Sequence, residues 1–153
     1  MEENGCQGDP GARNGLLRAG LWLLAVVSVG AGTWALFLPR LFYEDLPLPG
    51  RGWVSALGPY NEHLVRDVGA LYLALAVPLA GAAIFLERRL VQVALVTWLV
   101  SAVPHFVYHM TMLHHFPLLV DKAEQVVGYG FVVLLPLILL GRIGIAANDR
   151  AMR

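Results

Sequence analysis

Four long stretches of the chain contain no aspartate, glutamate, lysine or arginine, and this feature constrains the fold more than any other. The stretches cover residues 19–38, 68–86, 90–120 and 125–141. A helix that crosses the hydrocarbon core of a membrane needs roughly 17–25 apolar residues, so each stretch is long enough to span it. We therefore predict an all-α integral membrane protein, built as a four-helix bundle.

The composition of the chain agrees with a membrane protein and argues against several soluble classes. The chain is 58% hydrophobic and 14% charged, with a mean hydropathy of +0.63, whereas a soluble domain carries about 25% charged residues. The formal net charge is zero, so no basic field would attract nucleic acid. The single cysteine, Cys6, excludes an internal disulfide and a Cys-x-x-Cys redox pair. The main expected partner is therefore the lipid bilayer.

The charge-free stretches and their flanks set the expected element bounds. We predict membrane helices at about residues 16–38, 61–86, 89–114 and 122–142, and an outer loop over residues 39–60. Asn61 is expected to cap the second helix. Residues 1–14 are predicted to form a disordered tail and residues 144–153 a second tail, which leaves residues 15–143 as the membrane domain. The first apolar run lacks a clear cleavage site, so we expect it to be retained.

Arginine and lysine are distributed unequally between the two ends of these helices. One end carries the larger set, which is Arg13, Arg18, Arg88, Arg89, Arg142, Arg150 and Arg153. The other end carries Arg40, Arg51 and Lys122. Because cytoplasmic loops are enriched in arginine and lysine, both termini are predicted to be cytoplasmic in a multi-pass protein of the plasma membrane. The loop 39–60 is then extracytoplasmic, with Tyr43 and Trp53 expected at the depth of the lipid headgroups.

Two polar clusters lie at the predicted extracytoplasmic ends of neighbouring helices. Four of the five histidines fall within residues 105–115, and a second cluster occupies residues 61–67. Ionisable side chains inside a membrane segment are costly unless they have a partner or a function. These clusters are therefore the candidate functional site, except for His114 and His115, which lie at the loop and are expected to be structural.

The spacing within the clusters predicts a metal site. His63 and Asp67 are four residues apart, as are His105 and His109, so each pair shares one face of a helix. The second and third helices are joined by a short turn, and antiparallel packing would bring both pairs to the same height. Imidazoles with a carboxylate are ligands for zinc, iron or copper. The predicted metal ligands are His63, Asp67, His105 and His109.

If the site is catalytic, the remaining polar residues of the second cluster have natural roles. Glu62 would be the general base on a metal-bound water, and Arg66 would hold an anionic headgroup or intermediate. Asp67 would be either a ligand or the partner that orients an imidazole. The substrate would be a lipid or quinone that enters from the bilayer, although metal handling without catalysis fits the same residues.

Two other classes of function remain open, and so does the existence of catalysis. Ion pairs of Arg66 with Asp67 or Glu62 could lock two helices together or dock a partner. The protein would then be a non-enzymatic subunit that assembles with itself or with other membrane proteins. A small transporter is a further alternative, and at this chain length it would have to be a homo-oligomer.

The chain resembles a known membrane family in several segments. The resemblance rests on residues 58–70 (GPYNEHLVRDVGA), supported by residues 42–45 (FYED), 52–54 (GWV), 104–105 (PH) and 108–109 (YH). These segments are similar to those of uncharacterised small membrane proteins from high-GC Gram-positive bacteria. The likeness implies the membrane class and no assigned reaction. The four-helix layout also resembles the DoxX-like membrane proteins, a group with mostly indirect redox associations.

Overall fold

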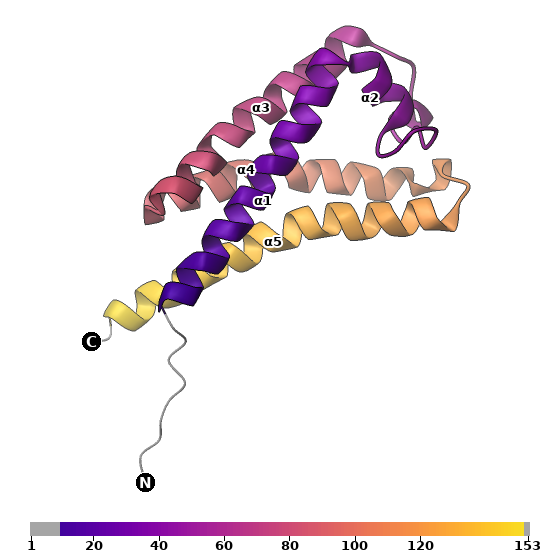
Figure 1. Cartoon of the computed structure of the whole chain (residues 1–153). Coiled ribbons are helices and arrows are strands. Elements are labelled where there is room, and N and C mark those ends of the chain that lie inside the picture. The colour runs from indigo at the N-terminus through magenta and orange to yellow at the C-terminus, as the bar shows by residue number, and fades with distance from the viewer. Residues whose placement is uncertain (1–9, 152–153) are drawn as a thin grey trace.

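The computed structural model describes residues 10–151, which form an all-helical chain (Figure 1). The elements, in order, are α1 (Pro10–Phe37), α2 (Pro39–Asp45), η1 (Ser55–Leu57), α3 (Glu62–Phe85), α4 (Arg88–Met112), η2 (Leu113–His115) and α5 (Leu119–Ala151). The side chain of Asn61 accepts a hydrogen bond from the backbone N–H of Leu64 at 3.1 Å, which confirms the predicted cap. α1 and α5 extend into the two predicted tails, although residues 1–9 and 152–153 lie outside the described part.

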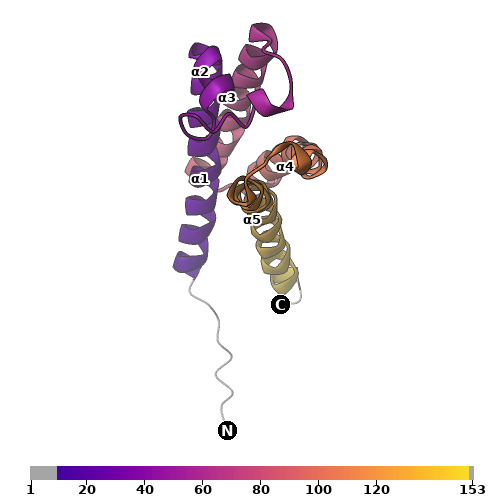
Figure 2. The same cartoon turned by 90° about the vertical axis from the view of Figure 1, so that its right-hand side faces the viewer.

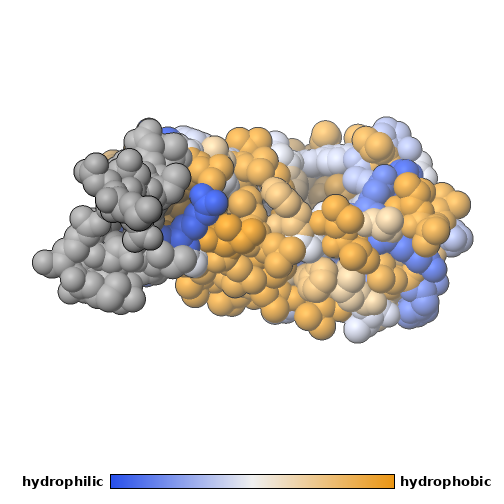
Figure 3. Space-filling model, turned by 90° about the horizontal axis from the view of Figure 1, so that it is seen from below, coloured by the Kyte–Doolittle hydropathy of each residue, from blue (hydrophilic) through white to orange (hydrophobic). Residues whose placement is uncertain are grey.

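The prediction of four long apolar helices is confirmed. The segments long and apolar enough to cross a membrane are Asn14–Phe37, Glu62–Phe85, Arg88–His115 and Leu119–Ile143. Only 11% to 39% of the most apolar window of each segment is buried inside the protein. The face shown in Figure 3 is correspondingly apolar over most of its coloured surface, with hydrophilic residues gathered at the end away from the grey atoms. A surface of this kind is compatible with a multi-pass membrane protein.

The long helices are arranged as two pairs that diverge from one end of the molecule. α1 runs along α3, and α4 runs along α5, with the two pairs splayed apart (Figures 1 and 2). Glycine allows the close approach of α1 and α3, because a Cβ on Gly69 would lie 2.5 Å from the backbone nitrogen of Leu36. A Cβ on Gly32 would lie 2.9 Å from the carbonyl oxygen of Gly69. The two backbones are therefore in direct contact, as at small-residue helix crossings in membranes.

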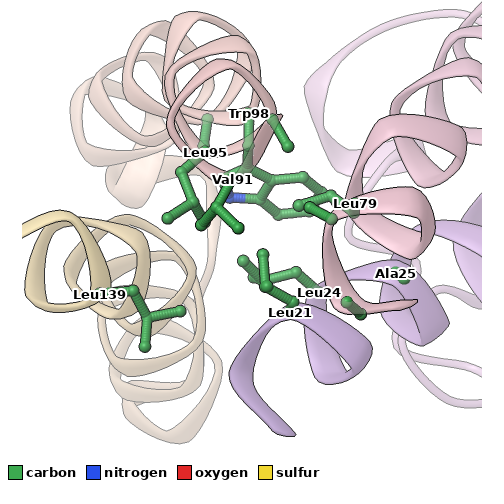
Figure 4. Packing of buried hydrophobic residues seen from close by; sticks show 12 residues of the cluster. Leu21, Leu24, Ala25, Leu79, Val91, Leu95, Trp98 and Leu139 are labelled. Carbon is green, nitrogen blue, oxygen red and sulfur yellow. The ribbon is translucent and has the colours of Figure 1, made fainter. Parts of the chain in front are cut away.

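The main hydrophobic core lies where the two pairs meet. Leu21 of α1, Leu79 of α3 and Leu95 of α4 are fully buried there, and Leu139 of α5 completes the cluster (Figure 4). Trp98 donates a hydrogen bond from Nε1 to the carbonyl oxygen of Val132 at 2.8 Å. This bond satisfies a buried indole and fixes α4 against α5.

α3 and α4 meet only near the turn that joins them. Leu86 turns the chain in the left-handed conformation, with φ of 51°, and its N–H caps α3 on the carbonyl oxygen of Ala82. The residues that α3 contributes to the main core, Leu79, Ala82 and Ala83, all lie close to this turn. Further along, the two helices separate (Figure 1). Antiparallel packing along their whole length, expected from the short turn, does not occur.

The segment between α2 and α3, residues 46–60, folds back over the open end of the molecule, and we call it the roof segment. Phe42 of α2 and Val65 of α3 form a small second core with Ala35, while the Tyr43 hydroxyl donates a hydrogen bond to the carbonyl oxygen of Gly58 at 2.6 Å. The side chain of Trp53 is buried within the protein, with 8% of its surface exposed, and its expected position at the depth of the headgroups stays a prediction. An internal hydrogen bond, described below, holds its indole inside the protein.

Candidate functional site

A groove of about 540 Å³ lies between the two helix pairs, beneath the roof segment. We call it the inter-hairpin groove. α3 contributes Leu64 and Val68 to its lining, α4 contributes Ser101 and His105, and the roof segment contributes Trp53. This volume falls in the range of small-molecule sites, about 300–1,000 Å³. The groove is therefore large enough for a lipid-like or drug-sized ligand.

The lining of the groove is apolar and aromatic, and it contains no aspartate, glutamate, lysine or arginine. Its polar side chains are neutral amides, hydroxyls, indoles and imidazoles, drawn from Tyr43, Trp53, Asn61, Tyr72, Trp98, Ser101, His105, Tyr108, His109 and Tyr129. Few convergent polar groups in an otherwise apolar concavity are typical of a site for a lipophilic ligand.

Three aromatic rings from α4 and α5 form one contiguous group in the wall of the groove. The ring centroids of His105 and His109 are 4.5 Å apart, and Tyr129 lies 5.0 Å from His105 and 4.2 Å from His109. These separations are normal for packed aromatic rings. His109 is buried, whereas His105 is exposed in the groove.

One nitrogen of His109 is already bound. Its Nδ1–H donates to Oε1 of Gln125 at 3.0 Å, and both residues are buried, which leaves Nε2 of the imidazole as an acceptor. Gln125 Nε2 has no partner in the part of the chain that the structure describes. No carboxylate pairs with His105 or His109 among those residues, so a positive charge there would be uncompensated. Both imidazoles are therefore expected to be neutral.

Sequence reasoning missed Gln125 and Tyr129, although a signal for them exists. Asp121, Gln125 and Tyr129 are spaced four residues apart, which places them on one face of α5. Polar side chains at this spacing on an otherwise apolar helix indicate a face that meets other polar groups. Here that face meets the imidazoles of α4 and the tip of the roof segment.

Asp121 anchors the roof segment to α5. Its carboxylate accepts a hydrogen bond from Arg51 Nε at 2.7 Å and another from Trp53 Nε1 at 3.0 Å. Arg51 also bonds to Glu124. Asp121 is 5% exposed, so this carboxylate is buried together with its charge partner. These bonds join the roof segment to the beginning of α5.

The four metal and catalytic candidates of the second cluster lie outside the groove lining. His63 pairs with Asp67 at 3.2 Å, and their side chains are 88% and 56% exposed. Glu62 and Arg66, predicted to act beside a metal, form an exposed pair at 2.8 Å. Arg66 also donates from Nη1 to the carbonyl oxygen of Leu36 at 2.5 Å. Arg66 therefore connects α3 to the end of α1.

The predicted four-ligand cluster is not formed. Within residues 10–151, no group of three or more histidine, cysteine, aspartate or glutamate side chains is placed to hold a metal ion. His63 and Asp67 form one pair on α3, whereas His105 and His109 form another on α4. The physical reason is that α3 packs along α1 and separates from α4 beyond their turn.

The other two histidines behave as expected for a loop. His114 donates from Nδ1 to the carbonyl oxygen of Thr111 at 3.0 Å, and His115 does so to that of Met112 at 3.3 Å. Both are exposed, and each bond is made to the preceding turn of the same segment. These contacts fit a structural role at the end of α4.

Comparison with protein-family models, with curated proteins and with solved structures finds no match for this chain. The likeness to the small membrane proteins of high-GC Gram-positive bacteria stays a prediction from its motifs.

Proposed function

We propose that this chain is a multi-pass protein of the plasma membrane that binds a lipophilic small molecule, of the lipid or quinone class, in the inter-hairpin groove. The observation that carries the proposal is the lining of this groove. It is apolar and free of charged side chains, yet it contains two adjacent imidazoles, His105 and His109, which pack against the ring of Tyr129. His109 is also hydrogen-bonded to Gln125. Such a site suits a molecule with a long apolar body and one polar end.

The groove lies between helices that are long enough to span the bilayer, so a ligand could enter from the surrounding lipid. His105 and His109 lie further along α4 from the core residue Trp98, toward the roof segment. The polar end of a bound ligand would therefore lie toward the roof, with its apolar body between the helix pairs. The distribution of arginine and lysine supports placing the roof on the extracytoplasmic side, with both termini in the cytoplasm.

The test uses two neighbouring residues of α4. Ser101 lines the groove, whereas Val100 is 70% exposed and lies outside the lining. Ser101→Trp fills the groove with an indole, and Val100→Trp adds the same side chain to the outer surface. We expect a lipophilic molecule to co-purify with the wild type and with Val100→Trp, and to be lost from Ser101→Trp, as measured by native mass spectrometry. Equal retention in all three proteins would contradict the proposal.

A second candidate, a non-enzymatic subunit whose polar cluster holds helices together, is favoured by one observation. Arg66 bonds both to Glu62 on its own helix and to the backbone of Leu36 at the end of α1. This is a helix-joining contact, and it does not conflict with ligand binding in the groove. Its contribution to stability is tested by the variants described below.

A further inference from the structure

We infer that the inter-hairpin groove selects a lipophile with an uncharged, oxygen-bearing head and discriminates against phospholipids and fatty acids. The inference rests on the proposed function and deepens it by naming the class of ligand. It follows from the charges around the groove, from the hydrogen-bonding groups inside it and from the shape of its polar wall.

The lining of the groove is uncharged. No arginine, lysine, aspartate or glutamate lines the groove. A phosphate or carboxylate enclosed there would lose its hydration without gaining a counter-charge, and an uncompensated buried charge is strongly unfavourable. An uncharged head carries no such penalty.

The arginines near the roof are already paired with carboxylates. Arg40 pairs with Glu44, Arg51 with Asp121 and Glu124, and Arg66 with Glu62. Lys122 lies outside the lining of the groove. An anionic head would therefore have to break an existing ion pair to obtain a cation.

The lining of the groove also offers unused hydrogen-bonding groups. The hydroxyls of Tyr72, Tyr108 and Tyr129 make no hydrogen bond within the described residues, and Nε2 of His109 has no partner there either. Phenols can both donate and accept, and a neutral imidazole nitrogen can accept. A carbonyl or hydroxyl oxygen on the ligand would satisfy these groups without bringing a charge into the groove.

The polar wall of the groove is built from packed aromatic rings. The rings of His105, His109 and Tyr129 pack together, and the ring of Trp53 lies 6.4 Å from that of Tyr129. Aromatic walls pack well against flat groups. A planar quinone ring and a glycerol hydroxyl share the uncharged, oxygen-bearing chemistry, and separate arms of the experiment distinguish these two sources.

The experiment titrates the purified full-length protein in detergent with three probes and measures occupancy by native mass spectrometry. Dioleoylglycerol and dioleoylphosphatidic acid have the same acyl chains and differ in head charge, while a prenyl benzoquinone supplies a planar head. We expect at least one neutral probe to bind about tenfold or more tightly than phosphatidic acid. His109→Phe should weaken that binding, whereas Val107→Phe on the exposed side of α4 should not.

A charge-introducing variant keeps the inference falsifiable even if removal of a histidine disturbs folding. Ser101→Lys places a cation in the lining and should shift preference toward phosphatidic acid, whereas Val100→Lys on the outer surface should leave it unchanged. If phosphatidic acid binds the wild type as tightly as the neutral probes, and Ser101→Trp blocks it, the inference is wrong while the proposed function stands. If Ser101→Trp blocks no probe, the proposed function itself is wrong.

Discussion

Arg51 donates a hydrogen bond from Nε to Oδ1 of Asp121, 70 residues further along the chain, at 2.7 Å. This contact joins the roof segment to α5, and Trp53 reinforces it by donating to the same carboxylate oxygen. Because Asp121 is buried, the pair is protected from the solvent screening that weakens surface ion pairs. The roof is thereby fastened to both helix pairs, since its other end continues into α3.

Asp121→Ala should detach the roof segment. Arg51 and the Trp53 indole would lose their acceptor, and Arg51 would keep only its contact with Glu124. We expect the free energy of unfolding to fall by about 1–3 kcal/mol, measured by thermal unfolding in detergent. Hydrogen exchange should increase most within residues 46–60. Glu44→Ala removes an exposed ion pair with Arg40 and serves as the control, with an expected loss below about 1 kcal/mol.

Gly69→Ala should disrupt the α1–α3 pair. A Cβ at this position would lie 2.5 Å from the backbone nitrogen of Leu36, and backbone cannot move aside as a flexible side chain can. We expect destabilisation of about 1–3 kcal/mol through overpacking. Gly130→Ala is the matched control, because no atom lies within 4 Å of its added Cβ. Equal melting temperatures for the two variants would show that the close crossing is not required.

Gln125→Leu should loosen the polar wall of the groove. The substitution removes the acceptor of the His109 Nδ1–H while keeping a side chain of similar size. It also removes the unpartnered Nε2, which offsets part of the loss, so we expect a net destabilisation of only about 1 kcal/mol. Ligand co-purification should fall more clearly than stability does. Val126→Leu, at a more exposed neighbouring position, should retain both stability and ligand.

Arg66→Ala should weaken the junction of α3 with α1, whereas His63→Ala should have almost no effect. Arg66 makes contacts to Glu62 and to the backbone of Leu36, while the His63 side chain is 88% exposed. We expect Arg66→Ala to lower the free energy of unfolding by about 1 kcal/mol. In a double-mutant cycle with Glu62→Ala, the coupling energy should be about 0.3–0.5 kcal/mol. If Glu62→Ala lowers the free energy of unfolding more than Arg66→Ala does, Arg66 is not the residue that joins α3 to α1.

The orientation in the membrane can be tested with the natural cysteine. Cys6 is the only cysteine of the chain, and it lies on the predicted cytoplasmic side. In intact cells, a membrane-impermeant maleimide should fail to label the wild type and should label it after permeabilisation. In the Cys6→Ser background, His63→Cys should be labelled in intact cells, because this position is exposed near the roof. If Cys6 is labelled in intact cells and the cysteine of His63→Cys is not, the protein has the opposite orientation to the predicted one.

The sequence was sufficient for the features that depend on neighbouring residues. The length of a charge-free apolar run determines whether a helix can span a membrane, and a cap such as Asn61 acts on the backbone N–H three residues later. The pairing of His63 with Asp67 follows in the same way from helical spacing. His105 and His109 were recognised as a pair for this reason as well.

Only the tertiary structure decided which of these pairs would meet. Gly32 and Gly69 let α1 and α3 pack backbone to backbone, so α3 follows α1 and leaves α4, and His63 and Asp67 end outside the groove. His109 instead meets Gln125, and Arg51 meets Asp121. The spacing along one helix cannot predict such contacts, because they depend on how closely each pair of helices can approach and at what point they diverge.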